Sequence, residues 1–177
     1  MDSVHDRRRG INAGLEQLLL GRVAGEVNHV MSAAHVLHVD DDPSDTMLTK
    51  QACSKAGVSF QLHSVSDGEM AISYLSGADR YADRDIYPLP RLILLDLKMP
   101  RKTGFDVLVW IRSQDSLRYI PVVILTASNQ EEDIKRAYEL GANSFLVKPV
   151  GIHTLIEMVK LVDAYWLGIN QSPTLSV

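Results

Sequence analysis

The sequence predicts an α/β fold in which helices cover both faces of a five-stranded parallel sheet. Four short aliphatic runs are continuous instead of alternating, which is typical of strands buried on both faces of a parallel sheet. These runs are Val36–Val39, Leu92–Leu95, Val122–Leu125 and Phe145–Val147. Segments with helical spacing separate them, and repeated strand-to-helix units with right-handed crossovers give a doubly wound, three-layer α/β/α sandwich.

The first two helices have clear capping residues. The first is expected to begin after Asp42, a good N-cap, with Pro43 at its first position, and to end at Gly57. The next segment is FQLHSVSD, whose loose alternation predicts an edge strand. An Asp-Gly turn then opens a second helix, DGEMAISYLSG, which ends at Gly77, and a long polar loop leads to the third strand.

Three more helices are predicted in the second half of the chain. The stretch GFDVLVWIRSQ predicts a helix that buries Phe105, Leu108, Val109 and Ile111. The next helix, within NQEEDIKRAYELGA, is expected to have Asn129 as its cap and acidic residues near its N-terminus, where the helix dipole favours them. The last helix is expected to run from about Gly151 to Trp166 and to carry an apolar stripe of Leu155, Ile156, Val159, Val162 and Trp166.

Residues 1–34 are expected to form an extension that is weakly helical or disordered. Apolar residues recur there at near-helical spacing, but glycines interrupt them, each costing about 1 kcal/mol relative to alanine in a helix interior. Met31 is an alternative start for the folded unit. The folded domain is expected to span residues 35–167, followed by a tail at 168–177 that is too short for a DNA-binding or catalytic output domain.

Composition and charge argue against several classes of partner. The chain has 177 residues, of which 46% are hydrophobic and 23% charged, with a net charge of −4 and a pI near 5.8. These values suit an ordinary globular domain and give no reason to expect binding to DNA or to an anionic membrane. The single cysteine, Cys53, cannot form an internal disulfide, and no apolar stretch reaches the ~20 residues of a membrane span. We therefore expect a cytoplasmic protein.

Polar and charged residues follow the ends of the predicted strands. The first strand ends in Asp40, Asp41 and Asp42, the third in Asp96, the fourth in Thr126 and the fifth in Lys148. In open parallel sheets, ligands bind outside the carboxyl ends of the strands. We therefore expect these side chains to form one site at that edge of the sheet.

The acidic residues of this site predict a divalent metal. Close carboxylates raise one another's pKa unless a cation lies among them, and Mg²⁺ takes carboxylate and phosphate oxygens as ligands. An aspartate beside Mg²⁺ and a lysine can also attack a phosphoryl group and carry it as an acyl phosphate. We expect Asp96 to be this acceptor because the third strand is the expected centre of the sheet. Lys148 would then neutralise charge on the transferring oxygens.

The chain resembles the receiver domain of two-component response regulators in four ordered motifs, VDDDP, LILLDLKMPRKTG, VVILTAS and FLVKPV. The resemblance covers about residues 35–167. It implies a flavodoxin-like sheet with strand order 2-1-3-4-5, Mg²⁺ as the cofactor and a sensor histidine kinase as the phosphoryl donor.

The resemblance also implies roles for individual residues. Asp40 and Asp41 are similar to the acidic pair at the metal, with Asp41 as the direct ligand, and the backbone carbonyl of Lys98 is similar to another ligand. Asp96 is similar to the phosphorylated aspartate, which also contacts the metal. The other implied roles are a switch hydroxyl at Thr126, an aromatic switch at Phe145, a phosphate-binding Lys148 followed by a cis peptide at Pro149, and tuning of the phosphoryl lifetime by Lys98 and Ser128. A lysine at position 98 departs from the chemotaxis regulator of this family, so the lifetime does not carry over.

The loop GADRYADRDIYPLP, the turn DLKMPRKTG and the ending VDAYWL resemble more specifically the small regulators that pair with phytochrome-type histidine kinases. In that subgroup the C-terminal helix region forms homodimers, which implies a subunit contact near Tyr165 and Trp166. Capping of the core is an equally good interpretation of Trp166. Output is expected through protein contact, dimerisation or onward phosphotransfer.

Other interpretations of these residues stay open. The acidic triplet alone is typical of a solvated N-cap cluster, and His38 could be a metal ligand, although a hydrogen-bonded core histidine is the commoner case. One rival function is a haloacid-dehalogenase-type phosphohydrolase, which needs a second aspartate where this chain has Lys98. The other is a receiver-like binding module that is never phosphorylated, against which the full set of Asp, Thr and Lys residues counts. The expected function is a switch and not a dedicated enzyme.

Overall fold

The structure is a computed structural model that describes residues 33–173. It contains one five-stranded parallel sheet with the order β2-β1-β3-β4-β5. The strands are β1 (Ala34–Val39), β2 (Phe60–Val65), β3 (Leu92–Leu95), β4 (Val122–Thr126) and β5 (Ser144–Val147). The predicted fold class and strand order are confirmed. The extension predicted for residues 1–34 lies almost entirely outside the described residues.

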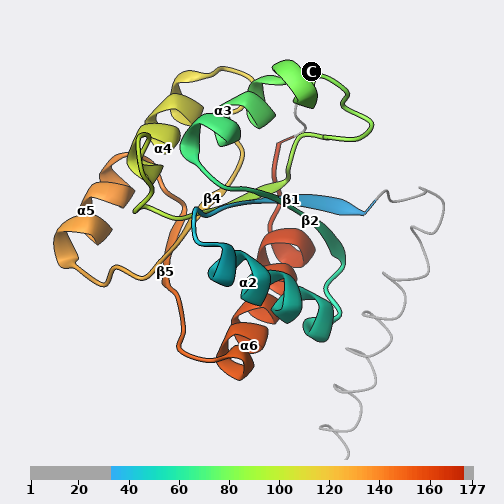
Figure 1. The fold of residues 1–177 in the computed structure, drawn as a ribbon, viewed down its shortest axis with the longest axis vertical. Helices are drawn as coiled ribbons and strands as arrows, with labels where there is room; N and C mark the ends of the chain where they lie inside the picture. The colour runs from blue at the N-terminus through green and yellow to red at the C-terminus, as the bar shows by residue number, and fades with distance from the viewer. Residues whose placement is uncertain (1–32, 174–177) are drawn as a thin grey trace, which may run out of the picture. The chain divides into compact units, whose positions relative to one another are not determined.

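Helices cover both faces of the sheet (Figure 1). They are α2 (Pro43–Ala56), α3 (Gly68–Ser76), α4 (Gly104–Ser113), α5 (Glu131–Glu139) and α6 (Ile152–Val162), with a 3-10 turn η1 (Asp79–Tyr81) after α3 and a π-helical segment η2 (Asp163–Ile169) after α6. α2 and α6 lie on one face, and α3, α4 and α5 lie on the other. Between residues 33 and 173, none of the helices combines the length and the apolar composition that a membrane span requires.

Two hydrophobic cores explain the continuous apolar runs of the central strands. In β3, Leu92 and Leu94 pack into the core beneath α2 and α6, whereas Ile93 and Leu95 pack into the core beneath α3, α4 and α5. Successive side chains of a strand point to opposite faces, so a strand covered on both faces needs an apolar residue at every position. The pattern of β3 therefore follows directly from the three-layer architecture. Val122–Leu125 of β4 obeys the same rule, whereas β1 also buries the polar His38.

β5 is less buried than its sequence predicted. All of its residues are at least partly exposed, and Val147 is 45% exposed. Among the strands of residues 33–173, β5 pairs only with β4, so it is an edge strand that solvent reaches along its free side. The expectation of a strand buried on both faces was wrong for this element because an aliphatic run does not distinguish a central strand from an edge strand.

Two details of the helices also differ from expectation. Val109 was expected to be buried but is 48% exposed, because the buried stripe of α4 passes through Leu108 and Ile111. Val109 lies about 100° further round the helix from Leu108. α5 has Gln130 and not Asn129 at its N-cap position, and the Gln130 side chain makes no capping hydrogen bond. Asparagine is a favourable N-cap residue, but α5 begins one residue later than an Asn129 cap would place it. Other groups can satisfy the free amides at the start of a helix, so the residue type alone did not decide where this helix begins.

Gly104, the first residue of α4, is packed directly against the chain that carries Asp96. A Cβ at this position would lie 2.1 Å from the Asp96 carbonyl oxygen and 2.8 Å from the Cα of Leu97. Gly104→Ala is therefore expected to lower the free energy of unfolding by about 2–3 kcal/mol, a value typical of forced overpacking.

The matched control is Gly168→Ala, where a Cβ would lie 3.9 Å from its nearest neighbour, the Asp163 carbonyl oxygen. Urea unfolding of both variants measures the difference. If Gly104→Ala were as stable as the control, the close packing of α4 on the Asp96 backbone would be contradicted.

Candidate functional site

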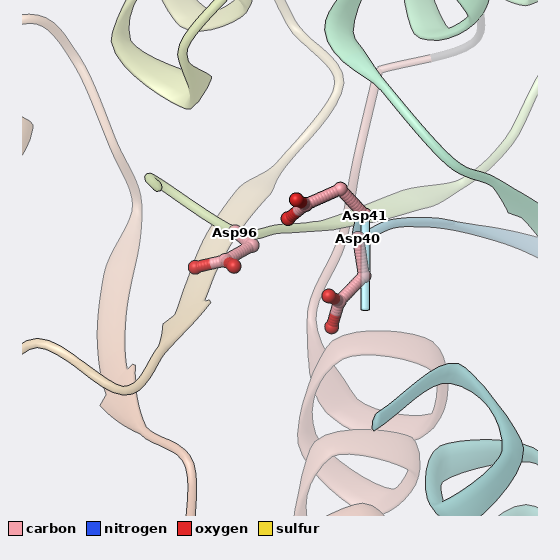
Figure 2. A group of neighbouring side chains, drawn as sticks. All are labelled: Asp40, Asp41 and Asp96. Carbon is pink, nitrogen blue, oxygen red and sulfur yellow. The ribbon is translucent and has the colours of Figure 1, made fainter. Parts of the chain in front are cut away.

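The strand order places the predicted acidic residues side by side. β1 and β3 are neighbours, with Val39 opposite Leu95, so Asp40 and Asp96 leave the sheet at the same edge. One carboxylate oxygen from each of Asp40, Asp41 and Asp96 lies within 4.8 Å of the other two (Figure 2). Residues that are far apart in the sequence thus form one cluster of oxygen atoms.

Asp42, the third acid of the triplet, lies outside this cluster and caps α2. Its carboxylate accepts hydrogen bonds from the backbone amides of Ser44 at 2.7 Å and Asp45 at 3.3 Å. These bonds satisfy amides that have no partner within the helix. The capping interpretation is therefore confirmed for Asp42, whereas Asp40 and Asp41 lie beside Asp96.

Lys148, which follows β5, provides a cation for this cluster. Its ammonium nitrogen Nζ lies 2.8 Å from Asp40 Oδ2, 2.7 Å from Asp45 Oδ2 and 3.4 Å from Asp96 Oδ2. The Lys148 side chain is only 15% exposed, and that of Asp40 is fully buried. One ammonium group thus binds carboxylates from the ends of β1 and β3 and from the first turn of α2.

The pKa values of this cluster reflect the ion pairs. Burial alone would lower the pKa of Lys148, but hydrogen bonds to Asp40 and Asp45 and the charge of Asp96 raise it above its ordinary value. For Asp40, burial alone would raise the pKa, but the contacts with His38 and Lys148 hold it below its ordinary value. Asp40 and Lys148 therefore both carry their charges at neutral pH.

His38 is buried, as expected of a core histidine, but its polar contact is a long one to Asp40. It is 1% exposed, and its Nε2 atom lies 3.4 Å from Asp40 Oδ2. Its Nδ1 atom has no hydrogen-bond partner among the described residues. The cluster of oxygen ligands consists of Asp40, Asp41 and Asp96 without His38, so the geometry favours a supporting contact to Asp40 over metal ligation.

Thr126 and Phe145, the predicted switch residues, lie on adjacent strands. Thr126 is the last residue of β4 and is fully buried. Phe145 lies opposite Ile124 of β4 and packs against the core beneath α3, α4 and α5 while staying partly exposed. The Lys148 amide donates to the Thr126 carbonyl at 2.8 Å, which ties the ends of β4 and β5 together.

The peptide bond before Pro149 differs from the expectation. Every peptide bond in residues 33–173 is trans, so the predicted cis bond between Lys148 and Pro149 is wrong. The trans form of such a bond is intrinsically preferred by about 0.5–1 kcal/mol. With this trans bond the Lys148 side chain still reaches Asp40 and Asp96.

Two acidic residues that were not predicted from the sequence lie beside the site, Asp45 and Asp133. Asp45 binds the Lys148 ammonium group, while Asp133 accepts a hydrogen bond from the Ser128 hydroxyl and lies 3.8 Å from the Lys98 ammonium nitrogen. Both occupy the first turn of a helix, where the helix dipole alone favours an acid. Only the tertiary structure reveals the lysines that these carboxylates contact.

The donor set fits a hard divalent cation. Counting Asp45, the site has four carboxylates against one ammonium group, that of Lys148, among the described residues. Carboxylate oxygens are the ligands that Mg²⁺ prefers, and a cation among them relieves their mutual repulsion. Asp96, which is 7% exposed, is also placed beside a fixed positive charge, as a phosphoryl acceptor requires.

Comparison with known proteins identifies relatives over most of the chain. Residues 36–160 match the family model described as the response regulator receiver domain. The chain is 36% identical over 153 residues to the probable methanogenesis regulatory protein FilR2 of Methanothrix harundinacea, which covers 86% of this chain and 96% of that protein. It is 35% identical over 132 residues to the response regulator Rcp1 of Synechocystis sp., covering 75% of this chain and 88% of Rcp1.

Two solved structures share the fold and a third of the sequence. The phosphorylated cyanobacterial phytochrome response regulator RcpA has a TM-score of 0.74 and 34% identity, covering 81% of this chain and 100% of that chain. The Mn²⁺-bound form of Rcp1 has a TM-score of 0.70 and 33% identity, covering 80% of this chain and 99% of that chain. One relative has thus been observed phosphorylated and another with a divalent metal ion.

Proposed function

The chain belongs to the response regulator receiver family, and we propose that it is a stand-alone switch in which Asp96 accepts a phosphoryl group from a sensor histidine kinase. The observation that carries this proposal is the cluster of Asp40, Asp41 and Asp96 with the Lys148 ammonium group beside it. In this proposal the chain acts as a switch and not as a dedicated enzyme.

In the proposed transfer, an Asp96 carboxylate oxygen attacks the phosphorus atom of a phosphohistidine. The new oxygen–phosphorus bond forms as the nitrogen–phosphorus bond breaks, so the product is an acyl phosphate and the histidine leaves. Asp40, Asp41 and Asp96, with the backbone carbonyl of Lys98, would hold the cation, which we take to be Mg²⁺. When bound, Mg²⁺ would neutralise charge on the transferring oxygens. Lys148 would bind a phosphoryl oxygen and hold it in place.

The phosphoryl group would then act on the end of β4. Its oxygens are new hydrogen-bond acceptors, and we propose that the Thr126 hydroxyl moves to donate to one of them. The Lys148 amide already bonds to the Thr126 carbonyl, which supports coupling between the two residues. Phe145 would turn inward as this loop moves, so the surface formed by α5 and α6 would change.

The partner of this switch is proposed to be a phytochrome-type histidine kinase in the cytoplasm. The support is the similarity to Rcp1 and to the phytochrome response regulator RcpA. We assign no role in DNA or membrane binding.

We also propose a homodimer through the C-terminal helix region. Trp166 packs against the core beneath α2 and α6, as the capping interpretation expected. Tyr165, by contrast, is 52% exposed. Its ring lies edge-to-face with the Trp166 ring, with the two ring centroids 5.0 Å apart. Leu161 and Ile169 are exposed apolar residues of the same region. Burial of these side chains by a second copy would remove apolar surface from water.

Incubation with acetyl phosphate and Mg²⁺, followed by intact mass measurement and peptide mapping, tests the proposed function. The expected result is a gain of one phosphoryl group, located on Asp96. Turnover of diverse phosphate esters would favour the phosphohydrolase instead, although the Lys98 side chain occupies the position where that family needs an acid. Absence of any adduct would favour the module that is never phosphorylated.

A further inference from the structure

Asp133, in the first turn of α5, contacts two residues from different loops. Its Oδ2 atom accepts a hydrogen bond from the Ser128 hydroxyl at 2.5 Å and lies 3.8 Å from the Lys98 ammonium nitrogen. Ser128 belongs to the loop after β4 and Lys98 to the loop after β3. A single carboxylate thus joins the two loops that border the acceptor.

Both partners of Asp133 lie close to the reacting groups. Lys98 is two residues beyond Asp96, and its backbone amide lies 3.5 Å from Asp96 Oδ1. Ser128 is two residues beyond Thr126, and its amide lies 3.4 Å from the Thr126 hydroxyl oxygen. A change in the position of either side chain therefore acts within two residues of the acceptor Asp96 or of the Thr126 hydroxyl.

Of the two contacts of Asp133, the one with Ser128 is the more buried and the one with Lys98 is the more exposed. Ser128 is 5% exposed and the Asp133 side chain 23%, so their hydrogen bond is partly shielded from water. The Lys98 side chain is 62% exposed, and its ion pair with Asp133 is correspondingly weaker. A local contact between the loop after β4 and the first turn of α5 would explain the Ser128 hydrogen bond alone, but it does not explain why a lysine from another loop lies beside the same oxygen.

We infer that Asp133 is a positioning residue that lengthens the lifetime of the aspartyl phosphate by holding Lys98 and Ser128 across the approach to the phosphoryl group. This inference depends on the proposed function. Hydrolysis requires a water oxygen to bond to phosphorus while the bond from phosphorus to the Asp96 oxygen breaks. Phosphate and the Asp96 carboxylate are the products, and the water proton passes to phosphate or solvent. The attacking water must come from the side opposite the breaking bond, and the inference places the Lys98 and Ser128 side chains across that approach.

The test measures loss of the phosphoryl group from Asp96 after the donor has been removed, by intact mass over time. Asp133→Ala removes both contacts and is expected to speed the loss by about tenfold, the lower end of the effect of one hydrogen bond to a charged group. Lys98→Met removes only the weaker contact and is expected to speed the loss less. If both act through the same arrangement, adding Lys98→Met to Asp133→Ala will produce no further change.

Two further variants separate positioning from helix stability. Asp133→Asn keeps an oxygen acceptor for Ser128 but loses the charge, so it should match Lys98→Met. Glu132→Ala removes a neighbouring acid of the same helix turn and should decay like the wild type. Thermal unfolding of each variant checks that differences in lifetime do not follow differences in stability.

An unchanged or slower decay in Asp133→Ala would overturn the inference, and so would an equal acceleration in Glu132→Ala. Failure of the wild type to take up any phosphoryl group is a different result, seen before decay begins, and would overturn the proposed function together with the inference.

Discussion

Asp96→Asn will reduce phosphoryl uptake from acetyl phosphate by more than about a hundredfold, because it removes the nucleophilic oxygen itself. The amide has nearly the same shape as the carboxylate, and its oxygen can still accept the hydrogen bond that Leu97 donates to Asp96 at 2.7 Å. The variant is therefore expected to keep the fold and to lose only the chemistry. Intact mass after incubation with donor and Mg²⁺ measures the result.

Asp115→Asn is the matched control for this experiment. The Asp115 side chain is 97% exposed and forms a surface ion pair with Arg118. It should take up one phosphoryl group like the wild type. Uptake by Asp96→Asn at the wild-type rate would show that another residue of the cluster, such as Asp41, is the acceptor.

Lys148→Met will lower the free energy of unfolding of the metal-free protein by about 3 kcal/mol, the range seen when one partner of a buried ion pair is removed. Methionine fills a similar volume but leaves the carboxylates of Asp40, Asp45 and Asp96 without the cation that they now share. The Asp40 side chain is fully buried, so water cannot replace the lost contact. Urea unfolding in the presence of a chelator measures the loss.

Mg²⁺ should stabilise Lys148→Met more than it stabilises the wild type, because the cation would then be the main positive charge among the acids. Lys160→Met is the control, since Lys160 forms an exposed ion pair with Glu157 within α6. Its expected effect is within about 0.5 kcal/mol. A Lys148 variant as stable as this control would contradict the view that Lys148 holds the acidic cluster together.

The fold could be predicted from the sequence because the central strands carry an unusually simple signal. Every position of Leu92–Leu95 is buried in one of two cores, and a short continuous aliphatic run between helical segments is typical of a strand covered on both faces. Burial of β5 was predicted incorrectly because the run Phe145–Val147 is equally apolar, and only the strand order shows that no described strand pairs with its outer side.

The site could be predicted in outline because parallel strands place their carboxyl ends at one edge. That rule was enough to group Asp40, Asp96 and Lys148, which the structure brings into contact. It could not separate Asp42, which caps α2, from its two neighbours in the triplet, because capping and metal binding both favour aspartate there.

The contacts that Asp45 and Asp133 make with lysines could not be predicted from the sequence, for a related reason. An acid in the first turn of a helix is favourable by itself, so its presence does not indicate a lysine in a distant loop. Lys148 and Lys98 lie beside these acids because the sheet brings the loops after β3 and β5 to the edge where α2 and α5 begin.

The central claim is that three carboxylates from two strand ends form a single binding site for a divalent cation. Calorimetric titration of the wild type and of Asp41→Asn with Mg²⁺ tests it most directly. The claim predicts one bound Mg²⁺ per wild-type chain and an affinity at least about tenfold weaker in Asp41→Asn, since the variant loses one of few charged ligands. Equal binding by the two proteins, or no binding by the wild type, would contradict it.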